Sequence, residues 1–311
     1  MTTARNRQIC LEATRYYHIV SRCVRRSFLC GIDELTQQSY EHRRAWIEKR
    51  LLYLAQYYCI DICAYAVMSN HYHIVVHVNT DKAQKLTDRA VITRWGKLHH
   101  LPPLAHKYLA DNVSSKAEHE ALQRYIITWR ERLQSISWFM RELNLYIANM
   151  ANKEDDCTGH FWEGRYKCQA LLDDKALIAA MAYTDLNPVR AGVSHAPEHS
   201  NYTSIKARVR GSKRLYPFKQ QHQNANKGEL PISLLEYIEI IDWTSRVSFQ
   251  GKNSLPPHSP HILQRLSFND SDWLNACTNI ENCRAAIIGS KQSFGAVMKL
   301  MCRKREHGLK I

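Results

Sequence analysis

The clearest chemical feature of the chain is the segment His71-Tyr72-His73. On a β-strand, side chains two residues apart point to the same face at about 7 Å from each other, so the two imidazoles lie on one face and Tyr72 on the other. Two imidazoles on one face can bind a divalent cation. His77 lies on the same face further along and is expected to support the pair or to have a structural role. In a chain with 16 histidines, a pair of packed core histidines also explains the motif.

A second candidate is a helical segment that carries Tyr183 and Asn187. Four residues span about one helical turn, so these two side chains share a face. An asparagine carbonyl oxygen is a suitable ligand for Mg²⁺ or Mn²⁺ and can complete a set begun by two histidines. A tyrosine hydroxyl becomes an effective nucleophile when its target is made electrophilic, as by a metal ion that polarises a phosphoryl oxygen. Taken singly, Tyr183 also fits a packing tyrosine, and Asn187 a turn residue before Pro188.

Strands and helices of a simple pattern must position these side chains. Segments rich in β-branched and aromatic residues predict four strands, of which the middle two form a hairpin: 15–22, 60–68, 71–78 and 165–172. Helical periodicity predicts helices over 39–58, over most of 81–156 with a break at the prolines of 101–106, and over 175–186, capped by Asp173 or Asp174 and stopped by Pro188. This order predicts an α+β sandwich in which helices cover one side of an antiparallel sheet.

Composition restricts the class of protein. The chain has 311 residues, of which 45% are hydrophobic, so it can form a packed core. It has no apolar run of the length that a membrane helix needs and no apolar secretion signal, and its 10 scattered cysteines form no CxxC pair. We therefore expect a cytoplasmic protein with reduced thiols and no membrane partner. The formal net charge of +14 favours a polyanionic partner such as nucleic acid.

The positive charge is concentrated outside the predicted strands. Residues 201–228 contain seven lysines and arginines and no acidic residue, which is half of the net charge of +14. This segment is either a solvated linker or a nucleic-acid contact. Residues 229–311 are predicted to be helical and amphipathic, ending in Arg303-Lys304-Arg305.

Four segments of the chain resemble the REP-associated tyrosine transposases, which belong to the single-tyrosine HUH (His-hydrophobic-His) class. They are YYHIVSRCVRRSFLCG at 16–31, YAVMSNHYHIVV at 65–76, GHFWEGRYKCQALLDD at 159–174 and AYTDLNPVRAGV at 182–193. The resemblance extends over roughly residues 13–200, about two thirds of the chain. Two departures are Ser69, where many relatives have proline, and the long helical insertion at about 81–156.

The resemblance implies a fold, a domain division and a set of site residues. The fold is a ferredoxin-like or RRM-like antiparallel sheet with helices on one side, a helical insertion and a mainly helical C-terminal extension. Residues 1–200 would form the catalytic domain, and residues 201–311 a basic linker and helical region. His71 and His73 match the metal pair, Asn187 the third ligand and Tyr183 the nucleophile. The implied enzyme is an endonuclease with strand-transfer activity that uses Mg²⁺ or Mn²⁺ in the bacterial cytoplasm or nucleoid.

The implied reaction is DNA transposition. Tyrosine attacks a phosphate of single-stranded, hairpin-forming DNA, such as a REP-like palindrome, and leaves a 5′-phosphotyrosine bond and a free 3′-OH that can rejoin strands. Candidate DNA-binding residues flank the first and fourth strands or follow Asn187: Arg22, Arg25, Arg26, Trp162, Arg165, Lys167 and Arg190. An aromatic ring beside cations can stack a base while the cations hold phosphates. Trp162 also fits a core position, and Arg190 a helix C-terminal cap.

Two other functions remain open at this point. A catalytically retired transposase would bind hairpin DNA without cutting it, and a zinc hydrolase unrelated to DNA would use the histidines alone. The DNA sequence recognised, the mobility of the element and the choice between monomer and homodimer are not determined by these motifs.

Overall fold

The computed structural model describes residues 8–24, 29–33, 36–220, 228–249, 260–280, 285–300 and 308–311. A six-stranded sheet lies at its centre, with the strand order β2-β3-β1-β4-β5-β6. The strands are β1 (Tyr16–Arg22), β2 (Ile60–Val67), β3 (His71–Val78), β4 (Lys167–Leu171), β5 (Ile287–Gly289) and β6 (Leu309–Lys310). The first four strands pair antiparallel, with β1 between β3 and β4. This is the predicted ferredoxin-like order, so the α+β prediction is confirmed.

The sheet has two more strands than predicted, because the C-terminal region adds β5 and β6 at its edge. β5 pairs parallel with β4, and β6 pairs parallel with β5. Residues 229–311 therefore supply two short strands as well as helices. The hydrophobic core does not divide near residue 200, because side chains of β2, α7 and the C-terminal helices share one buried cluster.

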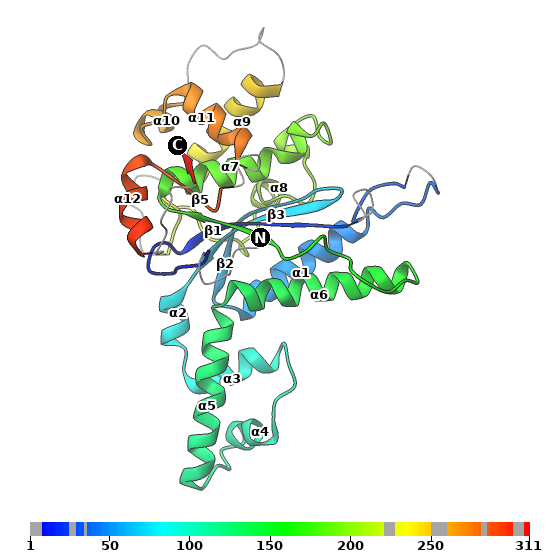
Figure 1. Ribbon diagram of the computed structural model, residues 1–311, viewed down its shortest axis with the longest axis vertical. Helices are drawn as coiled ribbons and strands as arrows, with labels where there is room; N and C mark the ends of the chain where they lie inside the picture. Colours follow the sequence, from blue (N-terminus) through cyan, green and yellow to red (C-terminus); the bar gives the residue numbers. More distant parts are fainter. Residues whose placement is uncertain are drawn as a thin grey trace.

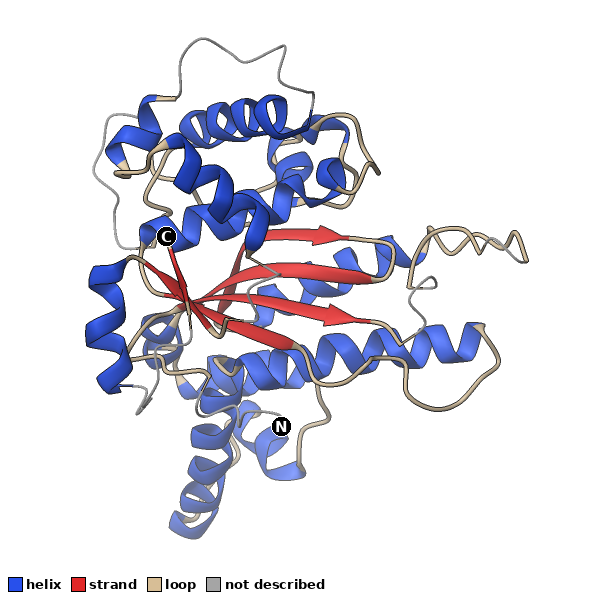
Figure 2. Cartoon of the chain, turned by 45° about the horizontal axis from the view of Figure 1, so that its top comes forward, coloured by secondary structure: helices blue, strands red, loops and turns tan. Residues whose placement is uncertain are grey.

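Helices cover both faces of the sheet, whereas the sequence predicted cover on one side (Figure 2). The helices α1 (Arg43–Tyr57) and α6 (Ile136–Glu154) pack on the face formed by Tyr72, Ile74 and Val76. The helix α7 (Asp174–Arg190) packs on the opposite face, against Val75. Both faces of β3 are apolar or uncharged along most of its length, so each face has to be buried by a helical layer.

The insertion between β3 and β4 is helical, as predicted, and its first helices extend away from the sheet (Figure 1). They are α2 (Thr80–Lys85), α3 (Asp88–Gly96), α4 (Pro103–Leu109) and α5 (Lys116–Leu133). The prolines at 102 and 103 do not simply break the helical region, since Pro103 begins α4, where a missing N–H costs no hydrogen bond. Ser135 separates α5 from α6 by capping the backbone N–H of Trp138.

The helix α7 is longer than the sequence predicted. Asp173 caps it by accepting a hydrogen bond of 3.0 Å from the backbone N–H of Ala176. It then continues through Pro188 to Arg190 and does not end near Leu186. A proline inside a helix costs about 3 kcal/mol, but every residue from Ala176 to Val189 is buried, so tertiary packing outweighs this cost.

The remaining helices are the 3₁₀ helix η2 (Pro197–His199), α8 (Ser204–Val209), α9 (Leu234–Phe249), α10 (His261–Arg265), α11 (Asp270–Asn279) and α12 (Lys291–Leu300). Most of them share a buried cluster with α7, whereas α12 packs in a separate small cluster with β5. Among the residues that the structure describes, no helix combines the length and hydrophobicity required to cross a membrane. The eight described cysteines are free thiols.

A buried carboxylate joins α7 to this C-terminal layer. Asp185 is fully buried and accepts hydrogen bonds from the Ser204 hydroxyl (2.6 Å), the Ile205 backbone N–H (2.9 Å) and the Tyr237 hydroxyl (2.7 Å). Burial raises the pKa of Asp185 above its ordinary value. A buried carboxyl group needs these donors, since a buried polar group without partners is strongly destabilising.

We predict that Tyr237→Phe lowers the free energy of unfolding by about 2 kcal/mol, because it removes a donor to a buried acid and leaves the ring packing unchanged. Chemical denaturation followed by circular dichroism measures this. The control is Tyr53→Phe, which removes only the exposed hydrogen bond from that hydroxyl to the Lys97 carbonyl. Equal stability of Tyr237→Phe and wild type would contradict the prediction.

Candidate active site

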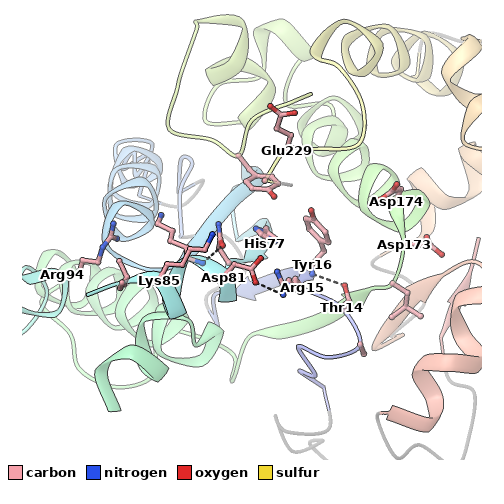
Figure 3. A pocket seen from close by; sticks show the side chains of 17 residues that line it. Thr14, Arg15, Tyr16, His77, Asp81, Lys85, Arg94, Asp173, Asp174 and Glu229 are labelled. Carbon is pink, nitrogen blue, oxygen red and sulfur yellow. Dashed lines mark hydrogen bonds and ion pairs between the residues drawn. The ribbon is translucent and has the colours of Figure 1, made fainter. Parts of the chain in front are cut away.

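The strand β3 places His71 and His73 side by side on the face covered by α7. Their ring centroids lie 4.8 Å apart, and His73 is fully buried whereas His71 is half-buried. His77 lies at the other end of this face, where its Nδ1 is 3.0 Å from Asp61 Oδ2. Figure 3 shows His77 beside Tyr16, in a cavity separate from the histidine pair. The structure therefore brings His71 and His73 together and places His77 elsewhere.

The helix α7 brings Tyr183 to the histidine pair, and Asn187 lies one turn further along the same helix. The ring of Tyr183 meets the ring of His73 edge-on, with 5.4 Å between centroids. Tyr183 is 1% exposed and Asn187 4% exposed. Residues more than 100 positions apart in the sequence thus form one buried cluster.

Arg190 holds the polar atoms of this helix face together. One terminal nitrogen of its guanidinium donates to the Tyr183 hydroxyl at 2.7 Å and lies 3.2 Å from Asn187 Oδ1. The other donates to the Thr278 carbonyl oxygen on α11 at 3.0 Å. The guanidinium carbon lies 4.2 Å from the centroid of the Tyr183 ring. Arg190, predicted as a DNA contact or a helix cap, therefore contacts the candidate nucleophile directly.

His18 on β1 is a member of the cluster that the sequence analysis missed. Its Nε2 lies 3.0 Å from His73 Nδ1, and the two rings are nearly parallel, with 5° between their planes and 5.2 Å between centroids. Its Nδ1 lies 2.7 Å from Gln169 Oε1 on β4. One signal was present, because His18 sits within the first predicted strand, but its contact with His73 depends on the pairing of β1 with β3.

The hydrogen bonds that link Gln169, His18 and His73 indicate which ring nitrogen carries the proton in His18 and in His73. Gln169 Nε2 donates to the carbonyl oxygens of Ile280 (3.1 Å) and Ala285 (2.8 Å), which orients its Oε1 toward His18 as an acceptor. His18 Nδ1 must then donate, so in the neutral ring Nε2 accepts. His73 Nδ1 donates to that Nε2, and the lone pair of His73 is on its own Nε2.

His71 has the same assignment. Its Nδ1 donates to Asn70 Oδ1, so its lone pair is also on Nε2. Burial, together with the neighbouring His71 and His18, lowers the pKa of His73 well below its ordinary value of 6.5. His73 is consequently neutral at neutral pH, as a metal-binding imidazole has to be.

These residues fit a divalent cation held by two imidazoles and one amide. The metal-binding histidines of proteins usually donate their second ring N–H to a fixed acceptor, as His71 and His73 do here. The Asn187 oxygen has two lone pairs, so it can bind a cation in addition to Arg190. Its Nδ2 is buried with no hydrogen-bond partner among the described residues. The described part of the chain contains no cluster of three or more His, Cys, Asp or Glu side chains arranged to hold a metal.

The predicted DNA-binding residues other than Arg190 fall into four groups by position. Arg22 is the register partner of His71 and so borders the cluster, while Arg165 and Lys167 are exposed near the start of β4. Trp162 donates its indole N–H to the Asn144 carbonyl oxygen at 2.9 Å and packs edge-on against Tyr72, on the other face of the sheet. Arg25 and Arg26 lie outside the described residues.

Comparison with solved structures gives a weak likeness. No protein-family model matches the chain, and no curated protein matches it. A solved structure of a REP-associated tyrosine transposase bound to a REP hairpin is 14% identical, with a TM-score of 0.37, over 70% of this chain and 93% of that chain. A likeness at this level does not identify a function, which has to be inferred from the side chains themselves.

Proposed function

We propose that this protein is a transposase that cuts and rejoins single-stranded, hairpin-forming DNA through a 5′-phosphotyrosine intermediate. The observation that carries the proposal is the contact of Tyr183 on α7 with His73 on β3, one helical turn from Asn187. The Arg190 guanidinium contacts both the Tyr183 hydroxyl and the Asn187 oxygen, and the His73 ring beside Tyr183 contacts the ring of His71. This is the set of groups that phosphodiester transfer needs.

The proposed cofactor is Mg²⁺ or Mn²⁺, bound by Nε2 of His71, Nε2 of His73 and Oδ1 of Asn187. A bound cation would polarise the phosphoryl oxygen and neutralise charge that develops on it. All three protein ligands are neutral, so the full positive charge of the cation would be available to the phosphate.

In the proposed reaction, Tyr183 Oη forms a bond to the phosphorus atom and loses its proton. The bond from phosphorus to the 3′-oxygen breaks, and that oxygen takes up a proton to become a free 3′-OH. In the reverse step a 3′-OH attacks the phosphotyrosine, which restores the DNA strand and the Tyr183 hydroxyl. One phosphodiester replaces another in each step, so no nucleotide cofactor is required. Arg190 orients the phenolic oxygen and can stabilise negative charge on the phosphate.

The burial of Tyr183 sets a condition for this reaction. The side chain is 1% exposed, and Arg190 joins it to α11 through the Thr278 carbonyl. DNA must therefore displace Arg190 or α11 before the phosphate reaches the tyrosine. The same burial favours the second candidate function, a hairpin-binding protein that no longer cuts DNA.

The proposed partner is a hairpin formed by an imperfect palindrome, bound in the bacterial cytoplasm or nucleoid by a monomer or a homodimer. The net charge of +14 supports a polyanionic partner. Of the basic segment 201–228, residues 221–227 lie outside the described residues.

The test is to incubate the full chain with a labelled hairpin oligonucleotide that carries a single-stranded flank, with and without Mn²⁺. We expect an adduct that survives denaturing electrophoresis, and a tryptic peptide containing Tyr183 with an attached 5′-phosphonucleotide by mass spectrometry. EDTA should abolish the adduct, and added Mn²⁺ should restore it. Hairpin binding without an adduct under any divalent metal would favour the non-cutting protein instead.

A further inference from the structure

The helical insertion carries a ladder of aromatic rings that the proposed active site does not use. Tyr125 stacks on Trp129 with 5.4 Å between centroids, and Trp129 stacks on Trp95 at 6.0 Å with 13° between the ring planes. His99 also stacks on Trp95, with 3.9 Å between centroids. The inner rings of Trp95 and Trp129 are each 4% exposed, whereas the outermost ring, Tyr125, is 45% exposed. The ladder therefore ends in an aromatic ring at the surface.

This ring borders a groove of ≈ 570 Å³ between α5 and the segment that follows α3. The cationic side chains that line the groove are Arg124 and Arg132, and the exposed His100 lies with them. The lining contains no acidic residue. The Arg132 guanidinium carbon lies over the Trp138 ring, 4.1 Å from its centroid. The lining of the groove thus combines aromatic and cationic groups.

The larger cavity of ≈ 950 Å³ beside β1 has a different charge balance (Figure 3). Its lining combines four cationic with four acidic side chains: Arg15, Lys82, Lys85 and Arg94 with Asp81, Asp173, Asp174 and Glu229. Arg15 and Asp81 also form an ion pair of 3.1 Å. A phosphate backbone gains little attraction there, whereas the lining of the groove on the insertion contains cationic and no acidic side chains.

We propose that the groove binds an unpaired stretch of DNA, with one base stacked on Tyr125 and the adjacent phosphates held by Arg124 and Arg132. Stacking on an exposed aromatic ring is independent of sequence and requires an unpaired base, and arginine holds phosphate through charge-assisted hydrogen bonds. That the bound nucleic acid is DNA rests on the proposed function. The exposed aromatic ring and the cationic lining are observed independently of that function.

The position of the groove indicates which part of the substrate it contacts. Figure 1 shows α3, α4 and α5 extending from the sheet on the side opposite to α7. A strand bound there is separate from the phosphate that Tyr183 would attack. The groove would therefore hold single-stranded DNA distant from the cut, and its loss would weaken binding and leave the chemistry of bound substrate intact.

The experiment measures the affinity of the full chain for a fluorescent 20-nucleotide oligothymidylate by anisotropy in EDTA, over a series of salt concentrations. Tyr125→Ala should weaken binding about 10-fold with little change in salt dependence. Arg124→Gln should reduce the slope of log K against log[salt] by about 0.7, the value for one phosphate contact on a single strand. A 5-iododeoxyuridine oligonucleotide should crosslink to Tyr125 on irradiation.

Matched controls are Lys116→Gln, which removes one charge at the exposed start of α5, and Tyr146→Leu, which removes a 39% exposed tyrosine on α6. Neither should change the affinity more than 2-fold. The groove proposal is overturned if Tyr125→Ala and Arg124→Gln bind like wild type, or if wild type shows no single-strand binding. Because the assay contains no divalent metal, single-strand binding through Tyr125 would stand even if no covalent adduct ever formed.

Discussion

Replacing Tyr183 with phenylalanine is expected to abolish the covalent protein–DNA adduct, with a loss of cleavage of at least about 10³-fold, because the attacking oxygen is removed and no bond to phosphorus can form. Phenylalanine keeps the edge-on contacts of the ring with His73 and His18 and the stacking of Arg190. The substitution removes the hydroxyl and with it the hydrogen bond from Arg190. Denaturing electrophoresis of a labelled hairpin measures both adduct and cut strand.

The Tyr183→Phe variant separates catalysis from binding. Its hairpin affinity and thermal stability should stay close to wild type, because the core packing of α7 is unchanged. Tyr53→Phe, an exposed tyrosine on α1, is the matched control and should form the adduct normally. An adduct that persists in Tyr183→Phe would show that another side chain is the nucleophile, and a loss of hairpin binding would assign Tyr183 a structural role.

The parts of the site that lie within one element follow from the sequence. The alternation of a strand places His71 and His73 on one face, and β3 begins and ends at the predicted residues. The spacing of a helix places Tyr183 and Asn187 on one face. Both inferences need only local backbone geometry. The approach of α7 to β3 is not local, and it was expected only from the resemblance to transposases.

The features that sequence analysis missed depend on tertiary contacts. His18 meets His73 because β1 pairs with β3, and Gln169 meets His18 because β4 pairs with β1 on its other side. Pro188 remains inside α7 because the surrounding core outweighs its local preference. The second face of the sheet is covered by α7, and the strands β5 and β6 come from residues beyond 229, whose amphipathic pattern indicated helices and gave no sign of a sheet edge.

Among residues that are not proposed metal ligands, His18 is the one whose replacement we expect to weaken metal binding most. It stands in the middle of a hydrogen-bond chain that runs from Gln169 through His18 to His73. This chain sets the tautomer of His73, and its far end is fixed by two backbone carbonyls. Without an acceptor at His18, the proton on His73 can move to Nε2, the nitrogen that would bind the metal. The ring is also free to turn. Groups that orient a metal-binding histidine typically contribute 10–100-fold to affinity.

We therefore predict that His18→Phe weakens Mn²⁺ binding by about 10–100-fold, measured by electron paramagnetic resonance of free Mn²⁺. The ¹⁵N shifts of His73 should change from one tautomer to a mixture, a change that a merely structural role would not produce. His18→Gln, which can again place an oxygen near His73 Nδ1, should recover part of the affinity. Saturating Mn²⁺ should restore adduct formation in His18→Phe, whereas it cannot do so in Tyr183→Phe. An unchanged Mn²⁺ affinity in His18→Phe would show that the histidine chain only packs the core.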